Sequence, residues 1–499
     1  MTPTRRASLL VALALAAASC ASAQSPAPVK AAAGAASSRG VRITESQLTP
    51  AQRAFVDTLE RRTFLFFWEL AEPATGMMPD RWPTQSFIST AATGFALTAY
   101  PIGVERRWIT RDQAAVRTLS TLEFHWRAPQ DTANAGVTGY RGFFYHFLHP
   151  GTGERWEDVE LSDVDTGLFL MGALFCQSYF DRETDRERRI RSLVDSLVAR
   201  VEWRWMLVRP PLIAHGWTPR GGHLPYDWRG YNEAMFMNLL ALGSPTHAVS
   251  AETWKAWAEG YEWGTFHGEH YLGFAPLFGH QYSHAWVDFR GIQDEPMRAK
   301  GLDYFENSRR ATYAQRAYAM ANPSKFRDYG EDVWGLTACD GPFEAKVRLA
   351  GREREFRTYE ARGACFTRVT DDGTIAPTAV LGSLPFAPEV VVPAAHEMQK
   401  RYGQYIYGKY GFVDAFNPSF DFDLPLRHGK RVRGVGWVAS DYLGIDQGAI
   451  ISMIENHRSE LIWSVMKRNQ YLRRGLALAG FEGGWLDAAQ GETALPPSN

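Results

Sequence analysis

The feature that most constrains the fold is a repeated pairing of two kinds of helical segment along the chain. Segments rich in apolar and small residues, such as 163–181, alternate with charged amphipathic segments, such as 185–203. A helix without a polar face must be buried, whereas an amphipathic helix can cover it with one face and meet solvent with the other. The pairing predicts an all-α fold, a helical toroid in which an inner ring of helices is enclosed by an outer ring. A helical solenoid is the alternative, but the chain shows no convincing repeat of fixed length.

Local signals place the helices and one β-hairpin. Thr49 is a typical helix N-cap and Pro50 suits the first helical position, so a helix is expected from there to about Leu70. Residues Val347–Phe366 alternate in polarity around Gly351, which predicts a small β-hairpin insert. The other helices are expected at residues 88–100, 110–126, 163–181, 185–203, 232–243, 250–261, 279–289, 301–321, 377–403, 447–467 and 469–481.

The N-terminus has the pattern of a secretory signal peptide. Arg5 and Arg6 precede a short apolar run, and Ala21-Ser22-Ala23 offers a cleavage site. Cys20 follows a loose lipobox, so an N-terminal lipid anchor is the alternative to a soluble protein. Both leave the protein in the periplasm or anchored to the outer membrane. The predicted organisation is a signal peptide at 1–23, a flexible linker at 24–45, one domain at 46–485 and a disordered tail at 486–499.

Composition excludes several classes of partner. The 499 residues carry a net charge of −1, which argues against nucleic acid and against a polybasic membrane binder. After the signal peptide, no stretch is long and apolar enough to span a membrane. The chain holds 17 Trp, 20 Tyr and 29 Phe, several of them in polar, Gly-rich loops where they could stack on sugar rings.

Cysteine and histidine usage predicts no metal and no cofactor. Cys176 lies in an apolar helical run and is expected to be a buried thiol. Cys339 and Cys365 bracket a charged insert and could form a disulfide in an oxidising compartment. No Cys/His set has metal-ligand spacing, and the chain lacks a phosphate loop and a dinucleotide fingerprint.

The loop from Trp217 to Pro245 places a carboxylate among aromatic residues. Glu233 stands where the loop gives way to an apolar run, so a helix is expected to begin near it. The simple interpretation is that Asn232 caps this helix and Glu233 interacts with its dipole. The functional interpretation is a carbohydrate site, because Trp228 and Tyr231 precede the carboxylate and similar loops recur along the chain.

Five further loops combine carboxylates with aromatic or hydrogen-bonding side chains. For Arg290 and its neighbours, structural ion pairing is the alternative to ligand binding. Glycosidic cleavage requires two opposed carboxyl groups, and the chain lacks the Gly-x-Ser-x-Gly context of a serine hydrolase. The candidate residues are Asp163 and Asp165; Gln281, His284 and Arg290; Asp332 and Trp334; Asp414; and Trp437 and Glu455.

Several long runs resemble the glycoamylase-like domain of bacterial β-1,2-glucanases. They include ELSDVDTGLFLMGAL, YNEAMFMNLLALGSPTH, QYSHAWVDFRGIQD, YGEDVWGLTACDGP, GTIAPTAVLGSLPFAPE, YGFVDAFNPSFD and LGIDQGAIISMIENHRS. The resemblance covers about residues 50–485 in unbroken order. It implies an (α/α)6 glycoside hydrolase domain that acts on β-1,2-glucan with inversion.

The resemblance also assigns roles. It implies Glu233 as the general acid, Asp414 as the residue that holds or activates the attacking water, and Asp165 as a ligand of the central sugar. The residues expected to bind substrate are Asp163, Trp228, Tyr231, Gln281, His284, Arg290, Asp332, Trp334, Trp437 and Glu455. Asp163, Asp332 and Glu455 remain alternative bases. Exo action, transglycosylation and a non-catalytic glucan-binding protein remain alternative functions.

Overall fold

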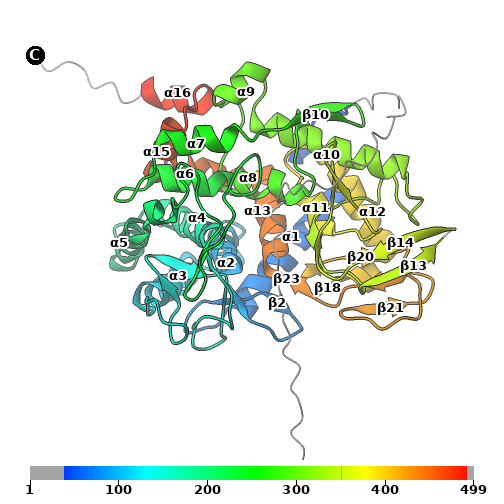
Figure 1. Ribbon diagram of the computed structural model, residues 1–499, viewed down its shortest axis with the longest axis horizontal. Helices are drawn as coiled ribbons and strands as arrows, with labels where there is room; N and C mark the ends of the chain where they lie inside the picture. Colours follow the sequence, from blue (N-terminus) through cyan, green and yellow to red (C-terminus); the bar gives the residue numbers. More distant parts are fainter. Residues whose placement is uncertain (1–38, 350, 492–499) are drawn as a thin grey trace, which may run out of the picture.

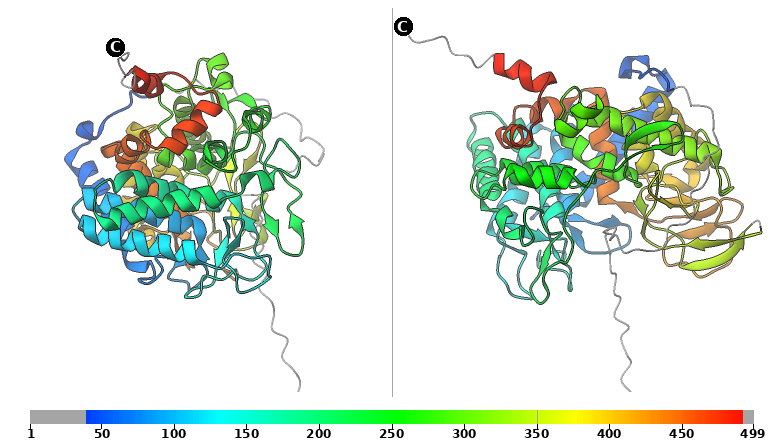
Figure 2. Two further views of the ribbon diagram at one scale, coloured as in Figure 1. Left: turned by 90° about the vertical axis from the view of Figure 1, so that its left-hand side faces the viewer. Right: turned by 45° about the horizontal axis from the view of Figure 1, so that its top comes forward.

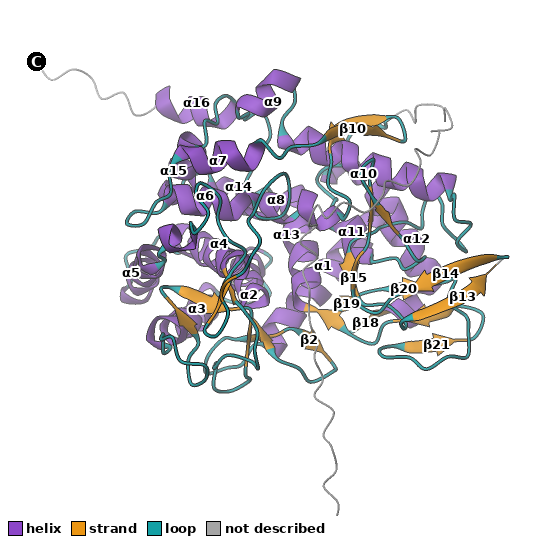
Figure 3. Ribbon diagram, viewed as in Figure 1, coloured by secondary structure: helices purple, strands orange, loops and turns teal. Residues whose placement is uncertain are grey.

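The computed structural model describes residues 39–349 and 351–491, in which helices dominate (Figures 1 and 3). The α-helices are α1 (Pro50–Leu70), α2 (Thr90–Glu105), α3 (Arg111–Arg127), α4 (Asp163–Tyr179), α5 (Asp185–Arg200), α6 (Met235–Gly243), α7 (Ala251–Ala258), α8 (Tyr282–Trp286), α9 (Glu295–Lys300), α10 (Tyr304–Ala321), α11 (Pro377–Leu381), α12 (Pro388–Ile406), α13 (Gly444–Arg458), α14 (Leu461–Met466), α15 (Gln470–Leu478) and α16 (Gly484–Gly491).

Two classes of helix are present, as the sequence pattern predicted. Helices α2, α4, α6, α8, α11 and α13 are buried along nearly all their length. Helix α2 packs on α4, α4 on α6, α6 on α8, α8 on α13 and α13 back on α2, while α11 packs on α13. The amphipathic helices α3 and α5 pack on α2 and α4 respectively, and Figure 2 gives two further views of these layers.

Helices α2 and α4 meet through two glycines. A Cβ on Gly94 would lie 2.3 Å from the carbonyl oxygen of Leu168, and one on Gly172 would lie 2.0 Å from the carbonyl oxygen of Gly94. Neither position can hold a larger residue unless the helices move apart. The backbones of α2 and α4 are therefore in direct contact, which fixes the separation of their N-terminal ends.

The prediction of an all-α fold is corrected by many short sheets. Most strands have only two or three residues, too few to leave a visible alternation in the sequence. The sheets have the strand orders β4-β5-β7-β8-β9, β1-β3-β6, β20-β22-β21, β2-β23, β10-β11, β12-β15, β13-β14, β16-β17 and β18-β19. The strands are β1 (Met78–Pro79), β2 (Arg81–Trp82), β3 (Ile88–Ser89), β4 (Gly139–Tyr140), β5 (Phe143–Tyr145), β6 (Phe147–Leu148), β7 (Leu161–Ser162), β8 (Trp217–Thr218), β9 (Gly222–His223), β10 (Trp263–Phe266), β11 (Glu269–Leu272), β12 (Ala338–Cys339), β13 (Ala345–Leu349), β14 (Arg352–Phe356), β15 (Glu360–Ala361), β16 (Gly363–Ala364), β17 (Val369–Thr370), β18 (Tyr407–Gly408), β19 (Gly411–Phe412), β20 (Phe416–Asn417), β21 (Lys430–Val432), β22 (Gly436–Val438) and β23 (Tyr442–Leu443).

The predicted hairpin is confirmed, with its turn at Gly351 and paired strands β13 and β14. Two predicted helices are broken in the structure. The helix expected at 377–403 is divided into α11 and α12, and α12 begins again at Pro388, a residue that suits a first helical turn. The helix expected at 447–467 is divided at Glu460, whose φ of 59° lies in the left-handed region.

The domain edges differ from those expected. Arg39 forms ion pairs with Glu269 and Glu306, and the N–H of Gly40 donates to the Tyr313 hydroxyl at 3.0 Å. The described part of the predicted linker is thus attached to α10. Helix α16 carries helical structure beyond residue 485, into the segment expected to be a disordered tail. The signal peptide and Cys20 lie outside the described residues.

Three cysteines of the described chain are buried free thiols, which confirms Cys176 and removes the disulfide alternative. The Arg362 guanidinium donates to the sulfur of Cys339, and the Cys365 thiol contacts the Thr367 hydroxyl at 3.0 Å. None of the described helices has the length and hydropathy needed to span a membrane.

Candidate active site

The acidic side chains of interest gather at the N-terminal ends of buried helices. Asp163 and Asp165 lie in the first turn of α4, Glu233 stands two residues before α6, and Asp446 is the third residue of α13. Helix N-termini have unpaired N–H groups and a positive partial charge, so they stabilise nearby negative charge. The buried helices thereby supply a common acidic end.

Asp165 is held between a cap residue and a histidine. Ser162 caps α4, and its hydroxyl also donates to Oδ2 of Asp165, which lies 3.6 Å from Nε2 of His146. Burial raises the pKa of Asp165, although His146 opposes the shift. Burial alone would lower the pKa of His146, but Asp165 and Glu160 raise it to about 9. His146 is therefore an imidazolium at neutral pH.

Asp163 faces the protein interior. The indole N–H of Trp228 donates to both of its carboxylate oxygens at 3.1 Å, and the backbone N–H of Val164 donates to Oδ1 at 2.8 Å. Burial raises the pKa of Asp163 to about 8. Trp228 also stacks on His215, with ring centroids 3.8 Å apart. Trp228 thus supports Asp163 from within the protein instead of offering a free face to a sugar.

Glu233 does not cap a helix. Helix α6 begins at Met235 with Ala234 as its N-cap and without a side-chain capping bond; the side-chain oxygen of Asn232 accepts the N–H of Ala234 at 3.0 Å, so the cap expected at Asn232 is not formed. Burial raises the pKa of Glu233 to about 7, and the charge of Asp165 adds to the shift. A carboxyl group of this kind stays partly protonated at neutral pH and can donate a proton.

Asp414 and Asp446 form a buried carboxyl pair. The two carboxyl groups are near enough to act on each other's pKa, which favours one shared proton over two negative charges. Burial and the neighbouring charges of Asp340 and Asp446 raise the pKa of Asp414 well above its usual range. Burial likewise raises the pKa of Asp446. Such a pair holds one proton and one negative charge over a wide pH range.

Backbone contacts fix Asp414 in place. Its N–H donates to the carbonyl oxygen of Asp441 at 2.8 Å, and its Oδ2 accepts the N–H of Asp340 at 2.8 Å. Within the described chain, the other oxygen, Oδ1, is buried without a hydrogen-bond partner. One oxygen of Asp414 is thus used for support and the other is left for a water molecule or a sugar hydroxyl.

Arg81 supplies positive charge beside the pair. Its guanidinium donates to Asp340 at 2.7 Å and to Asp80 at 3.0 Å, and lies 3.8 Å from Asp441. Asp340, Asp441 and His428 have ligand atoms within 4.8 Å of one another, as a metal site would need. Because Arg81 already contacts both carboxylates, the donor set suits an arginine better than a metal ion.

Electrostatic interactions join the two acidic groups into one site. The charge of Asp165 raises the pKa of Glu233, and the charge of Asp80 raises the pKa of both Asp165 and Asp446. Asp165 therefore acts on Glu233, and Asp80 acts on both Asp165 and Asp446, which links the two groups. The roles that the resemblance assigned to Glu233, Asp414 and Asp165 stay predictions.

Two tyrosines belong to this site, although the sequence analysis assigned neither to it. Tyr282, the first residue of α8, is only partly buried. Burial raises its pKa, and the charges of Asp446, Glu233 and Asp165 add to the shift. Burial also raises the pKa of Tyr359, together with Asp446, Asp414, Asp80 and Asp340. The position of Tyr282 at a predicted helix start offered a signal for it, whereas nothing local marks Tyr359.

Several predicted binding residues have packing roles instead. Gln281 donates to the Ala379 carbonyl and to Ser383, both at 2.8 Å, and so ties α8 to α11. His284 is fully buried, with Nε2 3.1 Å from the Ser308 hydroxyl, and burial lowers its pKa to about 3. Tyr231 stacks on Tyr304, with ring centroids 5.9 Å apart.

The remaining predictions follow the same pattern. Arg290 pairs with Asp288 and Glu460 at 2.7 and 2.6 Å, as the structural alternative proposed. Trp334 and Trp437 are fully buried, and the indole N–H of Trp437 donates to the His428 carbonyl at 2.8 Å. Asp332 is partly exposed in the turn before Trp334. A tryptophan in a polar loop of the sequence therefore does not by itself indicate whether its ring is free to stack on a sugar or is buried in the core.

Glu455 lies at the other end of α13 from Asp446. It contacts Arg106 at 2.7 Å and is separated from Asp446 by nine residues, or about 13 Å along a helix. The alternative assignment of Glu455 as the catalytic base is therefore not supported by its position.

Comparison with known proteins agrees with this arrangement. The Glycoamylase family model matches residues 225–470. The exo β-1,2-glucooligosaccharide sophorohydrolase (non-reducing end) of Parabacteroides distasonis is 28% identical over 473 residues, which cover 88% of this chain. The chain spans only 59% of the length of that curated relative.

Solved structures extend the similarity to the fold. The endo-β-1,2-glucanase of Chitinophaga pinensis, solved with sophorotriose and glucose, is 27% identical to this chain, with a TM-score of 0.74. The match covers 88% of this chain and 100% of that chain. The endo-β-1,2-glucanase of Talaromyces funiculosus shares the fold at 9% identity, with a TM-score of 0.60 over 90% of this chain and 92% of that chain. The resemblance drawn from the sequence is confirmed.

Proposed function

We propose that this chain, a relative of the glycoamylase-like β-1,2-glucanases, hydrolyses β-1,2-linked glucan with inversion at the anomeric carbon. The observation that carries the proposal is a buried Glu233 with a pKa of about 7 in the same site as the Asp414–Asp446 pair. An acid and a separate base are the two groups that an inverting hydrolysis requires. The names of the relatives supply the linkage, which the site chemistry alone does not specify.

In the proposed reaction, protonated Glu233 gives its proton to the glycosidic oxygen as the bond to the anomeric carbon breaks. Water attacks that carbon from the opposite face. The Asp414–Asp446 pair takes up one proton from the water, either directly or through a hydroxyl of the substrate. The product is the α-anomer, Glu233 is left ionised, and the pair is left fully protonated. Transfer of the pair's extra proton to solvent and reprotonation of Glu233 complete the cycle.

Other groups of the site would orient the sugar. Asp165, which His146 holds in place, is positioned to accept hydrogen bonds from hydroxyls of the central glucose. Tyr282, the first residue of α8, is near enough to Glu233 and Asp446 for both charges to raise its pKa. We further propose that α2, α4, α6, α8, α11 and α13 form the inner ring of an (α/α)6 toroid, with the site at its N-terminal end. The signal-like N-terminus supports action in the periplasm or at the outer membrane.

The test is incubation of the purified protein with linear β-1,2-glucan, followed by measurement of new reducing ends. Glucans with β-1,3 and β-1,4 linkages serve as matched controls for linkage. Proton NMR of the first product tests inversion, because α-anomer must appear before mutarotation. No release of reducing ends would contradict hydrolysis and favour a glucan-binding protein, whereas initial β-anomer would contradict inversion. Product lengths distinguish chain-end release from internal cleavage.

A further inference from the structure

The insert that follows β12 brings a tyrosine back to the acidic pair. Strand β12 pairs with β15 so that Ala338 faces Ala361 and Cys339 faces Glu360. The pairing ends there, and Asp340 and Tyr359 are the next residues of the two segments. The segments stay close beyond it, because a Cβ on Gly341 would lie 2.7 Å from the carbonyl oxygen of Thr358. The N–H of Asp340 donates to Asp414, the proposed water-binding carboxylate, at 2.8 Å. Asp340 therefore connects the Tyr359 segment to that carboxylate.

The phenol of Tyr359 is available to a ligand. The side chain is partly exposed and makes no hydrogen bond with any other described residue. Burial raises the pKa of Tyr359, and four carboxyl groups add to the shift. They belong to Asp446, Asp414, Asp80 and Asp340. A protonated phenol in such surroundings is a hydrogen-bond donor, and sugar hydroxyls and water accept such bonds.

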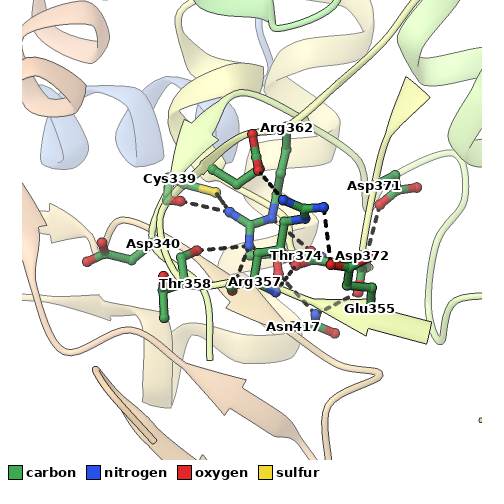
Figure 4. Close-up of polar contacts among 12 residues, drawn as sticks. Cys339, Asp340, Glu355, Arg357, Thr358, Arg362, Asp371, Asp372, Thr374 and Asn417 are labelled. Atoms are coloured by element: carbon green, nitrogen blue, oxygen red, sulfur yellow. Dashed lines mark hydrogen bonds and ion pairs between the residues drawn. The ribbon is translucent and has the colours of Figure 1, made fainter. Parts of the chain in front are cut away.

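A buried arginine holds both ends of the segment that carries Tyr359. Arg362 is 1% exposed, and its guanidinium donates to the carbonyl oxygens of Arg357 at 3.0 Å and Thr358 at 3.1 Å (Figure 4). The same group donates to the Cys339 carbonyl at 2.7 Å and to both oxygens of Asp372 at 2.8 Å. Arg362 therefore joins the Tyr359 segment, strand β12 and the strand-to-helix connection at Asp372 in one network.

The fit around this network is close. A Cβ on Gly341 would lie 2.1 Å from the Arg357 carbonyl oxygen and 2.3 Å from the Arg362 guanidinium. The segment thus lies directly against the chain that follows Asp340. Its position relative to Asp414 is set by backbone contacts and by one guanidinium, and not by an adaptable surface loop.

We infer that Tyr359 is a substrate-binding residue that donates a hydrogen bond to the sugar, or to the water, held at Asp414, and that Arg362 is its positioning residue. The inference rests on the proposed hydrolysis of β-1,2-glucan. It assigns to the insert a part in the reaction site, while the β13–β14 hairpin of the same insert projects outward at the edge of the molecule (Figure 1).

The experiment compares Tyr359→Phe and Arg362→Gln with Arg357→Gln. The side chain of Arg357 pairs with Glu355 and Glu360 at the surface of the same segment, so it is the matched control. We expect Tyr359→Phe to lower kcat/KM about 10-fold, the size of a lost hydrogen bond, while the melting temperature is unchanged. Arg362→Gln should lower kcat/KM at least as much, Arg362→Lys should recover part of the loss, and Arg357→Gln should match the wild type.

A double variant distinguishes a positioning role of Arg362 from a general loss of stability. If Arg362 acts through Tyr359, the double variant Tyr359→Phe/Arg362→Gln should be no less active than Arg362→Gln alone. Should Arg362→Gln fail to fold, Tyr359→Phe and the binding of a β-1,2-linked glucose trimer to Glu233→Gln and Glu233→Gln/Tyr359→Phe still decide the matter, with weaker binding expected for the second. Wild-type kinetics and binding after loss of the phenol would overturn the inference alone. An inactive wild type would overturn the proposed function and the inference together.

Discussion

The two ends of helix α13 carry the same kind of group in different surroundings. At its N-terminal end Asp446 is paired with Asp414, and near its C-terminal end Glu455 lies beside Glu60. Both pairs are buried, and burial followed by the charge of Glu455 raises the pKa of Glu60 well above its usual range. One helix therefore presents two proton-sharing carboxyl pairs, of which only one stands in the candidate site.

The difference lies in the arginines. Arg106 donates to Glu455 at 2.7 Å, and Arg458 donates to Glu60 at 2.5 Å, so the outer pair is held by two guanidinium groups. Asp414 and Asp446 have no such contact among the described residues, since Arg81 donates to Asp80 and Asp340 instead. A compensated pair is a structural link, whereas a pair without direct compensation is free to exchange its proton with a substrate.

The largest expected effect is on activity at the inner end. Asp414→Asn and Glu233→Gln should each lower kcat about 10²–10⁴-fold, because each removes one of the two proton-transfer groups. Circular dichroism and the melting temperature should show that both variants fold. Full activity in a folded Asp414→Asn protein would show that Asp414 is not the catalytic base and would favour Asp446 in that role.

The outer pair should show the opposite behaviour. Glu455→Ala removes the carboxylate that Arg106 contacts at 2.7 Å and leaves Arg106 only Glu60, at 3.4 Å. The variant is expected to lose up to about 3 kcal/mol of unfolding free energy, with kcat close to that of the wild type. Glu60→Gln is the comparison, because burial and Glu455 raise the pKa of Glu60 well above its usual range and an amide has nearly the same shape as the carboxyl group. Denaturant unfolding gives the stability. A large loss of kcat in Glu455→Ala at a temperature where it is folded would end the distinction between the two pairs.

Glu233→Gln should be stabilised at alkaline pH while it loses activity. The folded-state pKa of Glu233 is about 7, against an ordinary value of 4.5, so wild-type stability is fully present below pH 4.5 and is lost as pH rises through 7. The glutamine does not ionise, and above pH 8 the variant should be more stable by roughly 3 kcal/mol, from 1.36 kcal/mol for each pKa unit. Equal dependence of unfolding free energy on pH in both proteins would contradict a buried acid.

The smallest expected effect is a shift of the pH profile. Activity should fall above about pH 7 as Glu233 ionises, and should fall at lower pH as the Asp414–Asp446 pair takes up its second proton. Asp165 raises the pKa of Glu233, so Asp165→Asn should move the alkaline limb of kcat/KM to lower pH. The profile of kcat/KM against pH measures the shift, and an unmoved limb would show that another group sets it.

The sequence predicted the classes of helix better than the surroundings of each side chain. Helix pairing, the capped start at Pro50 and the hairpin at Gly351 depend on local patterns, and all are present. Glu233, Asp414 and Asp165 were singled out through local context and resemblance; all three are buried carboxyl groups with raised pKa values, and their catalytic roles stay predictions. Trp228 and His284 were misassigned because burial by distant elements leaves no local mark.

The residues that were missed depend on contacts between distant segments. Tyr359 enters the site only because the strand that follows it pairs with β12, and Arg81 only through its ion pair with Asp340, 259 positions later in the chain. Neither relation can be derived from one segment. The misplacement of Glu455, by contrast, could have been avoided, since a helix rises about 1.5 Å per residue and Asp446 precedes Glu455 on the same helix.

The glycine contact between α2 and α4 has a consequence for redesign of the enzyme. Gly94 and Gly172 allow the two backbones to touch, and α4 begins at the site with Asp163 and Asp165. A methyl group added at either glycine would push α2 and α4 apart at a point remote from the candidate site. A change in the bulk of glycan that the protein accepts could then be engineered from the core, without replacing a single residue that meets the substrate.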